Sequence, residues 1–192
     1  MSYIPQTIFS LVQPAVQSLA ARLFVLTSGR EGSAKYRPTV NTFYETGIVT
    51  SLYEHLLMSP KLQHLELRHE MSYRKKGQLG APKRVDLWLR HIDGARPVLI
   101  EAGDFAVGKV HEDLAKITKI NTTGTNWFLA FFRDPKKTNP ADPWNVIQNS
   151  FQHGAGLDPA KVEADQNLVT HFEVYRPTGN HDTFGVALLR GK

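Results

Sequence analysis

The spacing of hydrophobic residues divides the chain into segments of helical and of extended period. Apolar residues recur at helical intervals over residues 4–26, with Pro14 inside the run, which predicts one kinked helix or two short helices. A second helix is predicted over residues 42–58, where Pro60 follows the end of the apolar stripe. Residues 28–38 are rich in glycine, serine and basic residues, and they predict a loop between the two helical segments.

The rest of the chain alternates between strand and helix patterns. The predicted order is three strands, a helix, a strand, a short helix and two last strands. Their ranges are 65–73, 85–92, 97–102, 109–120, 126–132, 143–151, 168–175 and 183–189. The strand at 126–132 is apolar throughout, as expected for a central strand that is covered on both faces. This order predicts an α/β fold, a three-layer α/β/α sandwich with a central mixed sheet.

Length and composition fit one folded domain. The 192 residues are 41% hydrophobic, and none is cysteine, which excludes a disulfide framework, a thiolate metal site and a cysteine nucleophile. No apolar run approaches the roughly 20 residues of a membrane span, and no basic leader precedes the N-terminal apolar segment. We therefore expect a cytoplasmic protein with no membrane partner.

The net charge of +5 is concentrated in one stretch. Residues 60–91 contain eight lysines and arginines against three acidic residues, whereas the rest of the chain is balanced. Such a stretch could grip the phosphate backbone of DNA without reading bases, although a short charge run is also typical of a solvated strand and loop. The candidate phosphate-binding residues are Arg74, Lys75, Lys76, Lys83 and Arg84.

A predicted hairpin brings two carboxylates together. Asp93-Gly94 between two strand patterns is typical of a two-residue turn, and the register that it sets places Asp86 directly opposite Glu101. Like charges at facing positions destabilise a sheet unless something offsets them. A divalent cation would do so, and ligands that are all oxygen favour Mg²⁺ or Mn²⁺. A longer loop, or a solvated pair neutralised by neighbouring arginines, is the alternative.

A third carboxylate, Glu45, lies on the apolar side of its predicted helix, in line with Val49 and Leu52. Its alternative role is structural. Thr42 and Glu45 have the spacing of a capping box, in which the glutamate side chain would bind the backbone amide of the N-cap residue.

Residues 42–132 resemble the PD-(D/E)XK nuclease family, which has the restriction-endonuclease-like fold. The resemblance rests on the helix with Glu45, on residues 84–89 (RVDLWL), on residues 98–103 (VLIEAG) and on the element order. It implies that Glu45, Asp86 and Glu101 bind Mg²⁺ or Mn²⁺ and that the protein hydrolyses DNA. It also suggests a homodimer, because family members often dimerise to cut both strands.

The motif lysine of that family is missing, because Gly103 stands two residues after Glu101. The lysine helps to activate water and stabilises developing charge. The family often moves it to a neighbouring element, and Lys109, at the start of the next predicted helix, is the best substitute, with Lys83 second. A solvated first-turn lysine is the alternative for Lys109. Residues 103–109 also match a phosphate-binding G-x-x-x-x-G-K loop, but Val110 replaces the serine or threonine that such a loop requires.

The sequence thus predicts a single domain with a nuclease-like core. Residues 1–38 would form a helical extension and a basic loop, residues 42–132 the core, and residues 133–192 the rest of the sheet. The predicted activity is that of a Mg²⁺-dependent endodeoxyribonuclease with Asp86, Glu101, Lys109 and Glu45 at its site. An inactive member of the same fold, binding DNA or a protein, is the alternative.

Overall fold

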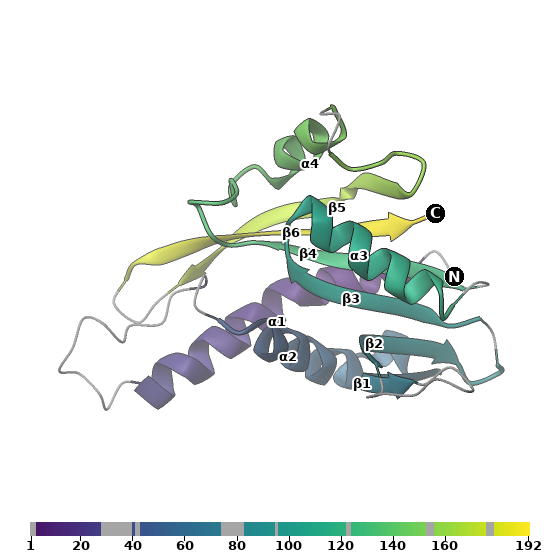
Figure 1. The fold of residues 1–192 in the computed structure, drawn as a ribbon. Helices are drawn as coiled ribbons and strands as arrows, with labels where there is room; N and C mark the ends of the chain where they lie inside the picture. The colour runs from purple at the N-terminus through teal and green to yellow at the C-terminus, as the bar shows by residue number, and fades with distance from the viewer. Residues whose placement is uncertain are drawn as a thin grey trace.

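The computed structural model is a mixed α/β structure built on one six-stranded sheet (Figure 1). It describes residues 3–27, 40, 43–73, 83–94, 96–121, 124–152, 156–175 and 179–192. Within these residues the helices are α1 (Tyr3–Thr27), α2 (Glu45–Met58), η4 (Pro60–Leu62), α3 (Val107–Thr118) and α4 (Pro143–Gln152). The strands are β1 (Leu65–Tyr73), β2 (Lys83–His91), β3 (Val98–Asp104), β4 (Thr125–Phe132), β5 (Val162–Tyr175) and β6 (His181–Gly191). None of the helices in the described part of the chain is long and apolar enough to cross a membrane.

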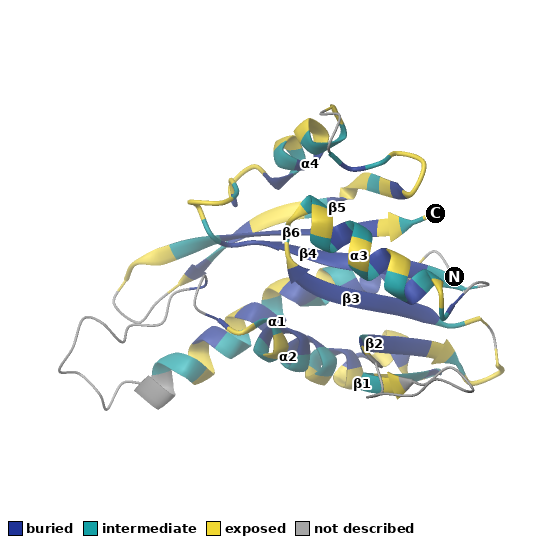
Figure 2. Cartoon of the chain, in the orientation of Figure 1, coloured by how far each residue is buried: buried dark blue, intermediate teal, exposed yellow. Residues whose placement is uncertain are grey.

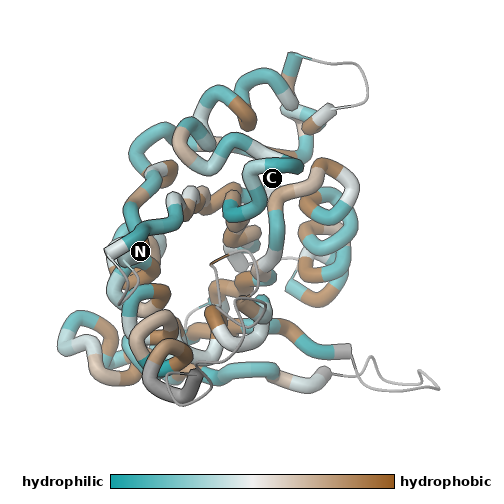
Figure 3. The backbone as a smooth tube through the Cα atoms, turned by 90° about the vertical axis from the view of Figure 1, so that its left-hand side faces the viewer, coloured by the Kyte–Doolittle hydropathy of each residue, from teal (hydrophilic) through white to brown (hydrophobic). Residues whose placement is uncertain are grey.

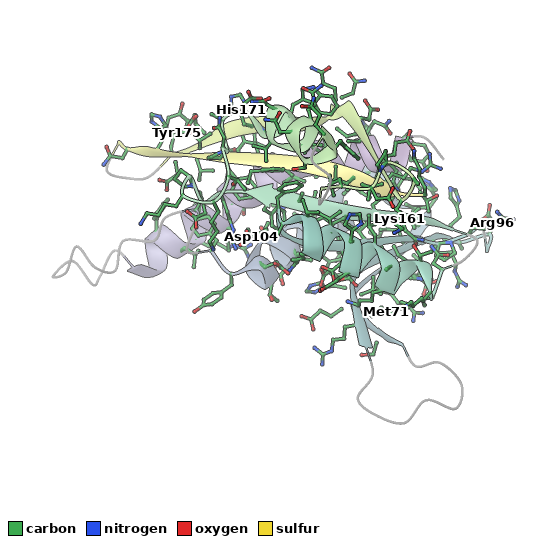
Figure 4. The ribbon with its side chains drawn as sticks, turned by 45° about the horizontal axis from the view of Figure 1, so that its top comes forward. Met71, Arg96, Asp104, Lys161, His171 and Tyr175 are labelled. Atoms are coloured by element: carbon green, nitrogen blue, oxygen red, sulfur yellow. The ribbon has the colours of Figure 1, made fainter. Side chains whose placement is uncertain are left out.

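The sheet combines a meander with one parallel pair. Its order is β1-β2-β3-β4-β6-β5, and only β3 and β4 run parallel, with α3 as their crossover. The predicted α/β class with a mixed sheet is confirmed, and the predicted element order is present. Met71 on β1 and His171 on β5 lie near its two edges, which are far apart in Figure 4.

Apolar side chains on the two faces of the sheet form two cores. On one face, residues of α1 and α2 such as Ile8 and Leu52 pack with Leu129 of β4. On the other, Leu114 of α3 and Ile147 of α4 belong to the core around Phe128. The central strands β3 and β4 are therefore buried except at one end residue of each, while the outer sides of the helices are exposed (Figure 2). Hydrophilic and hydrophobic residues accordingly alternate around the helical turns (Figure 3).

One predicted helix is confirmed in one of its two forms, and another begins later than predicted. The N-terminal segment is a single helix through Pro14, the first of the two predicted alternatives, because a continuous buried face on either side of the proline, with Ile8, Val12 and Val16, packs on the sheet. The second helix begins at Glu45, not at residue 42, and Tyr44 is its N-cap residue. The predicted loop at 28–38 lies outside the described residues.

The predicted hairpin register is confirmed, with a wider connection. Leu87 pairs with Ile100 and Trp88 with Leu99, in the register expected from Asp93-Gly94. The strands are joined by residues 92–97 in place of a two-residue turn, and Gly94 has the positive φ of 86° that glycine tolerates.

A buried arginine fixes the segment that leads into α2. Arg133, just after β4, forms a two-pronged ion pair with Asp104 at the end of β3, with N–O distances of 2.6 and 3.2 Å. The same guanidinium donates hydrogen bonds to the backbone carbonyls of Val40 and Phe43. Asp104 is labelled in Figure 4. The beginning of α2, and with it Glu45, is thus tied to the end of β3.

Candidate active site

The site forms where β2 and β3 separate. Their backbone pairing ends at Leu87 and Ile100, whereas β3 remains paired with β4 as far as Asp104. One position beyond the last β2–β3 pair, Asp86 Oδ2 accepts a hydrogen bond of 2.8 Å from the backbone N–H of Ala102. A side chain therefore takes the place of a backbone partner, and the register leaves Asp86 facing Glu101.

Glu101 is a buried acid in contact with a lysine. The residue is only 4% exposed, and Lys116 Nζ of α3 lies 2.5 Å from its Oε1. Among the described residues, this buried oxygen has no hydrogen-bond partner of good geometry, so the contact is an ion pair. Burial and the charge of Asp86 raise the pKa of Glu101 to about 8, although Lys116 acts against the shift.

Asp86 experiences the same environment. Burial raises its pKa, the Ala102 N–H opposes the rise, and the charge of Glu45 adds to it. Two acids that both resist ionisation side by side are typical of sites that bind a cation or hold a proton.

Glu45 and Lys109 form the second ion pair of the site. Lys109 Nζ lies 3.2 and 3.0 Å from the two carboxylate oxygens of Glu45, and both side chains are about one-third exposed. Burial alone would lower the pKa of Lys109, but its hydrogen bond to Glu45 and the carboxylate charges raise it. The capping-box alternative for Glu45 is wrong, because this residue is the first of α2 and the N-cap residue has no side-chain capping bond.

The lysine amine occupies the space that a side chain at position 103 would fill. A Cβ built on Gly103 would overlap the Cε and Nζ atoms of Lys109 and would come within 2.8 Å of Glu45 Oε2. Lys109 can therefore reach Glu45 past β3 only because residue 103 is a glycine. The structure thus places the amine of Lys109, a first-turn residue of α3, beside residue 103 and in an ion pair with Glu45.

Two site residues were missed by the sequence reasoning. Asp113 and Lys116 were not among the predicted site residues, yet the face of α3 that they share with Lys109 turns towards the acids of β2 and β3. Burial raises the pKa of Asp113, while the charges of both lysines lower it. The sequence contained a signal for this position, because Asp113 and Lys116 directly precede the buried residues Leu114 and Ile117 of the same helix.

The predicted phosphate-binding residues are only partly described. Arg74, Lys75 and Lys76 lie outside the described residues, as does the side chain of Lys83. Arg84 is exposed, and its guanidinium pairs with Glu70 at 2.6 Å. Their role in DNA binding stays a prediction.

The acids suit a divalent cation only in part. The described residues contain no group of three or more acids or histidines arranged to hold a metal ion. Asp86 and Glu101 are neighbours, but Glu45 is held by Lys109. The donors are all oxygen, and a cation would relieve the repulsion that the charge of Asp86 exerts on Glu101, although the Lys116 ammonium already lies 2.5 Å from Oε1 of Glu101. Asp86 and Glu101 thus fit Mg²⁺ or Mn²⁺, and a third ligand is not in place.

Comparison with known proteins adds no assignment. No family model, no curated protein and no solved structure matches the chain. The resemblance to PD-(D/E)XK nucleases therefore rests on the residues and on the element order alone.

The Gly103→Ala variant should displace Lys109. Because the overlapping atoms belong to the end of a flexible side chain, we expect a folded protein in which the Glu45–Lys109 pair is broken. The pKa of Lys109 should then fall, as followed by NMR of the labelled lysine side chain. Gly108→Ala is the matched control, since a Cβ there meets nothing within 4 Å. An unchanged Lys109 titration in Gly103→Ala would contradict the geometry.

Glu101 should make the stability of the metal-free protein depend on pH. Its folded-state pKa of about 8 exceeds the ordinary 4.5, so the native state keeps a proton that the unfolded chain has lost. The free energy of unfolding should fall between about pH 4.5 and 8, by at most about 1.4 kcal/mol per pH unit from this group. Glu101→Gln cannot ionise, so its stability relative to wild type should rise with pH across this range. Urea denaturation in EDTA measures this, and a constant difference would contradict the raised pKa.

Proposed function

We propose that the chain is a metal-dependent nuclease of the PD-(D/E)XK type that hydrolyses phosphodiester bonds of DNA. The observation that carries the proposal is the position of Lys109. Its amine lies beside Gly103 and next to Glu45, and the charge of Asp86 contributes to its raised pKa. A charge that the resemblance requires at position 103 is thus supplied from α3.

The arrangement of elements supports the same proposal. A helix, an antiparallel three-stranded meander, a crossover helix and a parallel strand follow one another as α2, β1–β3, α3 and β4. The proposed core is restriction-endonuclease-like, with helices on both faces of the sheet. The acids and the lysine come from α2, β2, β3 and α3, so only the folded core assembles the site.

Asp86 and Glu101 are the residues that would hold Mg²⁺ or Mn²⁺. When bound, the ion would supply Lewis-acid polarisation of the phosphate and a lowered pKa for water. The chain's own residues supply the rest of the charge. Lys109, whose pKa is raised, keeps a proton on Nζ and can donate it in a hydrogen bond to a phosphate oxygen. Glu45 holds this amine in place, and Lys116 offsets the charge of Glu101.

A non-catalytic member of the same fold is the second candidate. It is favoured by the Lys116 ammonium, which lies on Glu101 where a cation would bind, and by the absence of a three-ligand group among the described residues. Such a protein would bind DNA or a protein partner without cutting.

Cleavage of plasmid and linear DNA in Mg²⁺ or Mn²⁺ tests the proposal. We expect cleavage that EDTA abolishes and that Asp86→Asn and Glu101→Gln each reduce by about 10²-fold or more, because each removes a charge that would hold the cation. Glu112→Gln, an exposed acid on α3, is the control and should retain activity. Cleavage that survives both site variants would refute the site. Salt-sensitive DNA binding without any cleavage would instead establish the non-catalytic candidate.

A further inference from the structure

Two arginine side chains lie over the ring of a tryptophan near the proposed site. Trp88 is 8% exposed, and the guanidinium carbons of Arg68 and Arg90 lie 5.2 and 5.1 Å from its ring centroid. Contact with the aromatic face holds a planar guanidinium in one orientation while its edges stay free to bind oxygen. The two arginine side chains are 54% and 43% exposed, so these edges face solvent.

Glu66 bridges the two arginines. Its Oε1 accepts hydrogen bonds from Nε and Nη2 of Arg68 at 2.9 and 2.5 Å, and its Oε2 accepts one from Arg90 at 2.9 Å. These hydrogen bonds lower the pKa of Glu66, whose side chain is one-third exposed. The carboxylate thus places two oxygens that share one negative charge between two fixed guanidinium groups. We call Glu66, Arg68, Trp88 and Arg90 the arginine clamp.

The clamp lies on the side of the sheet that faces the site. Arg68 pairs with Trp88 across β1 and β2, and Glu66 pairs with Arg90. Trp88 belongs to the core under α3, the helix that carries Lys109 and Lys116. Trp88 and Asp86 are two residues apart on β2, a separation of about 7 Å along an extended strand. Arg90 is four residues from Asp86 on the same strand, so the clamp lies on the face of the proposed catalytic acids and is displaced from them along β2.

We propose that the arginine clamp binds a backbone phosphate of the nucleic acid substrate and that Glu66 occupies this position in the free protein. A phosphodiester, like a carboxylate, offers two oxygens that share one negative charge, and it matches the paired N–H groups of arginine. This inference rests on the proposed nuclease function, because it names the contact that holds the strand next to the acids. Binding of a phosphate would require the Glu66 side chain to release its three hydrogen bonds to the arginines and rotate away.

The test measures the affinity for a fluorescein-labelled DNA duplex by anisotropy in EDTA, where no cleavage is expected, at several salt concentrations. We expect Glu66→Gln to bind several-fold more tightly than wild type, because the internal competitor loses its charge. The double variant Arg68→Gln, Arg90→Gln should bind at least ten-fold more weakly, with a salt slope reduced by about one, as for the loss of one neutralised phosphate. Circular dichroism and thermal melting establish that each variant is folded.

The matched control is the exposed ion pair between Arg190 and Glu163 near the opposite edge of the sheet. Glu163→Gln and Arg190→Gln should leave the affinity within about two-fold of wild type. Equal changes in DNA affinity from substitutions at the clamp and at this control pair would overturn the proposal that the clamp binds phosphate. The absence of any DNA binding would overturn it as well. Cleavage by wild type combined with unaltered affinity of the clamp variants would refute the clamp alone. The expected affinity changes in a protein that never cleaves DNA would support the clamp and refute the nuclease.

Discussion

The central constraint of the structure is the burial of two facing acids, Asp86 and Glu101, where β2 and β3 part. Burial opposes the ionisation of both carboxylates, and the charge of Asp86 further raises the cost of ionising Glu101. The ammonium of Lys116 forms an ion pair with Glu101, and the backbone N–H of Ala102 donates a hydrogen bond to Asp86. The crossover helix α3 is therefore more than a connection between parallel strands, since it brings the cations to the acids.

Gly103 and Arg133 position the Glu45–Lys109 ion pair next to the two acids. The absence of a side chain at residue 103 lets the Lys109 amine reach Glu45, although the two residues belong to different helices. Arg133 binds Asp104, the next residue on β3, and holds the backbone that precedes Glu45. The helix that carries Glu45 is thus anchored next to the glycine that admits the lysine.

The α/β class and the order of the elements could be predicted from the sequence, because most elements have a helical or an alternating pattern of apolar residues. The alternation in VDLWLRHI and the Asp93-Gly94 turn were sufficient for the register of β2 and β3, even though the connection is wider than two residues. Helix starts were less certain. Thr42 and Glu45 have the spacing of a capping box, but an ion pair with Lys109, 64 residues away, engages Glu45. Local spacing carries no information on such a partner.

The site was predictable to the extent that it depends on strand register. Asp86, Glu101 and Lys109 could be proposed from the sequence, and the structure brings them together. The role of Lys116 could not be predicted, because a lysine on an exposed-looking helix row reveals its partner only when the helix docks on the sheet. The same holds for the stacking of Arg68 and Arg90 on Trp88, which depends on strand pairing between β1 and β2.

The most direct measurement of the central claim is a lysine exchange between positions 103 and 109. DNA cleavage in Mg²⁺ would be compared for wild type, Lys109→Ala, and the double variant Gly103→Lys, Lys109→Ala. If the Lys109 amine serves the motif-lysine position, the single variant should lose activity and the double variant should regain a substantial part of it. Full activity in Lys109→Ala, or an active wild type whose loss in Lys109→Ala is not relieved by lysine at 103, would contradict the account.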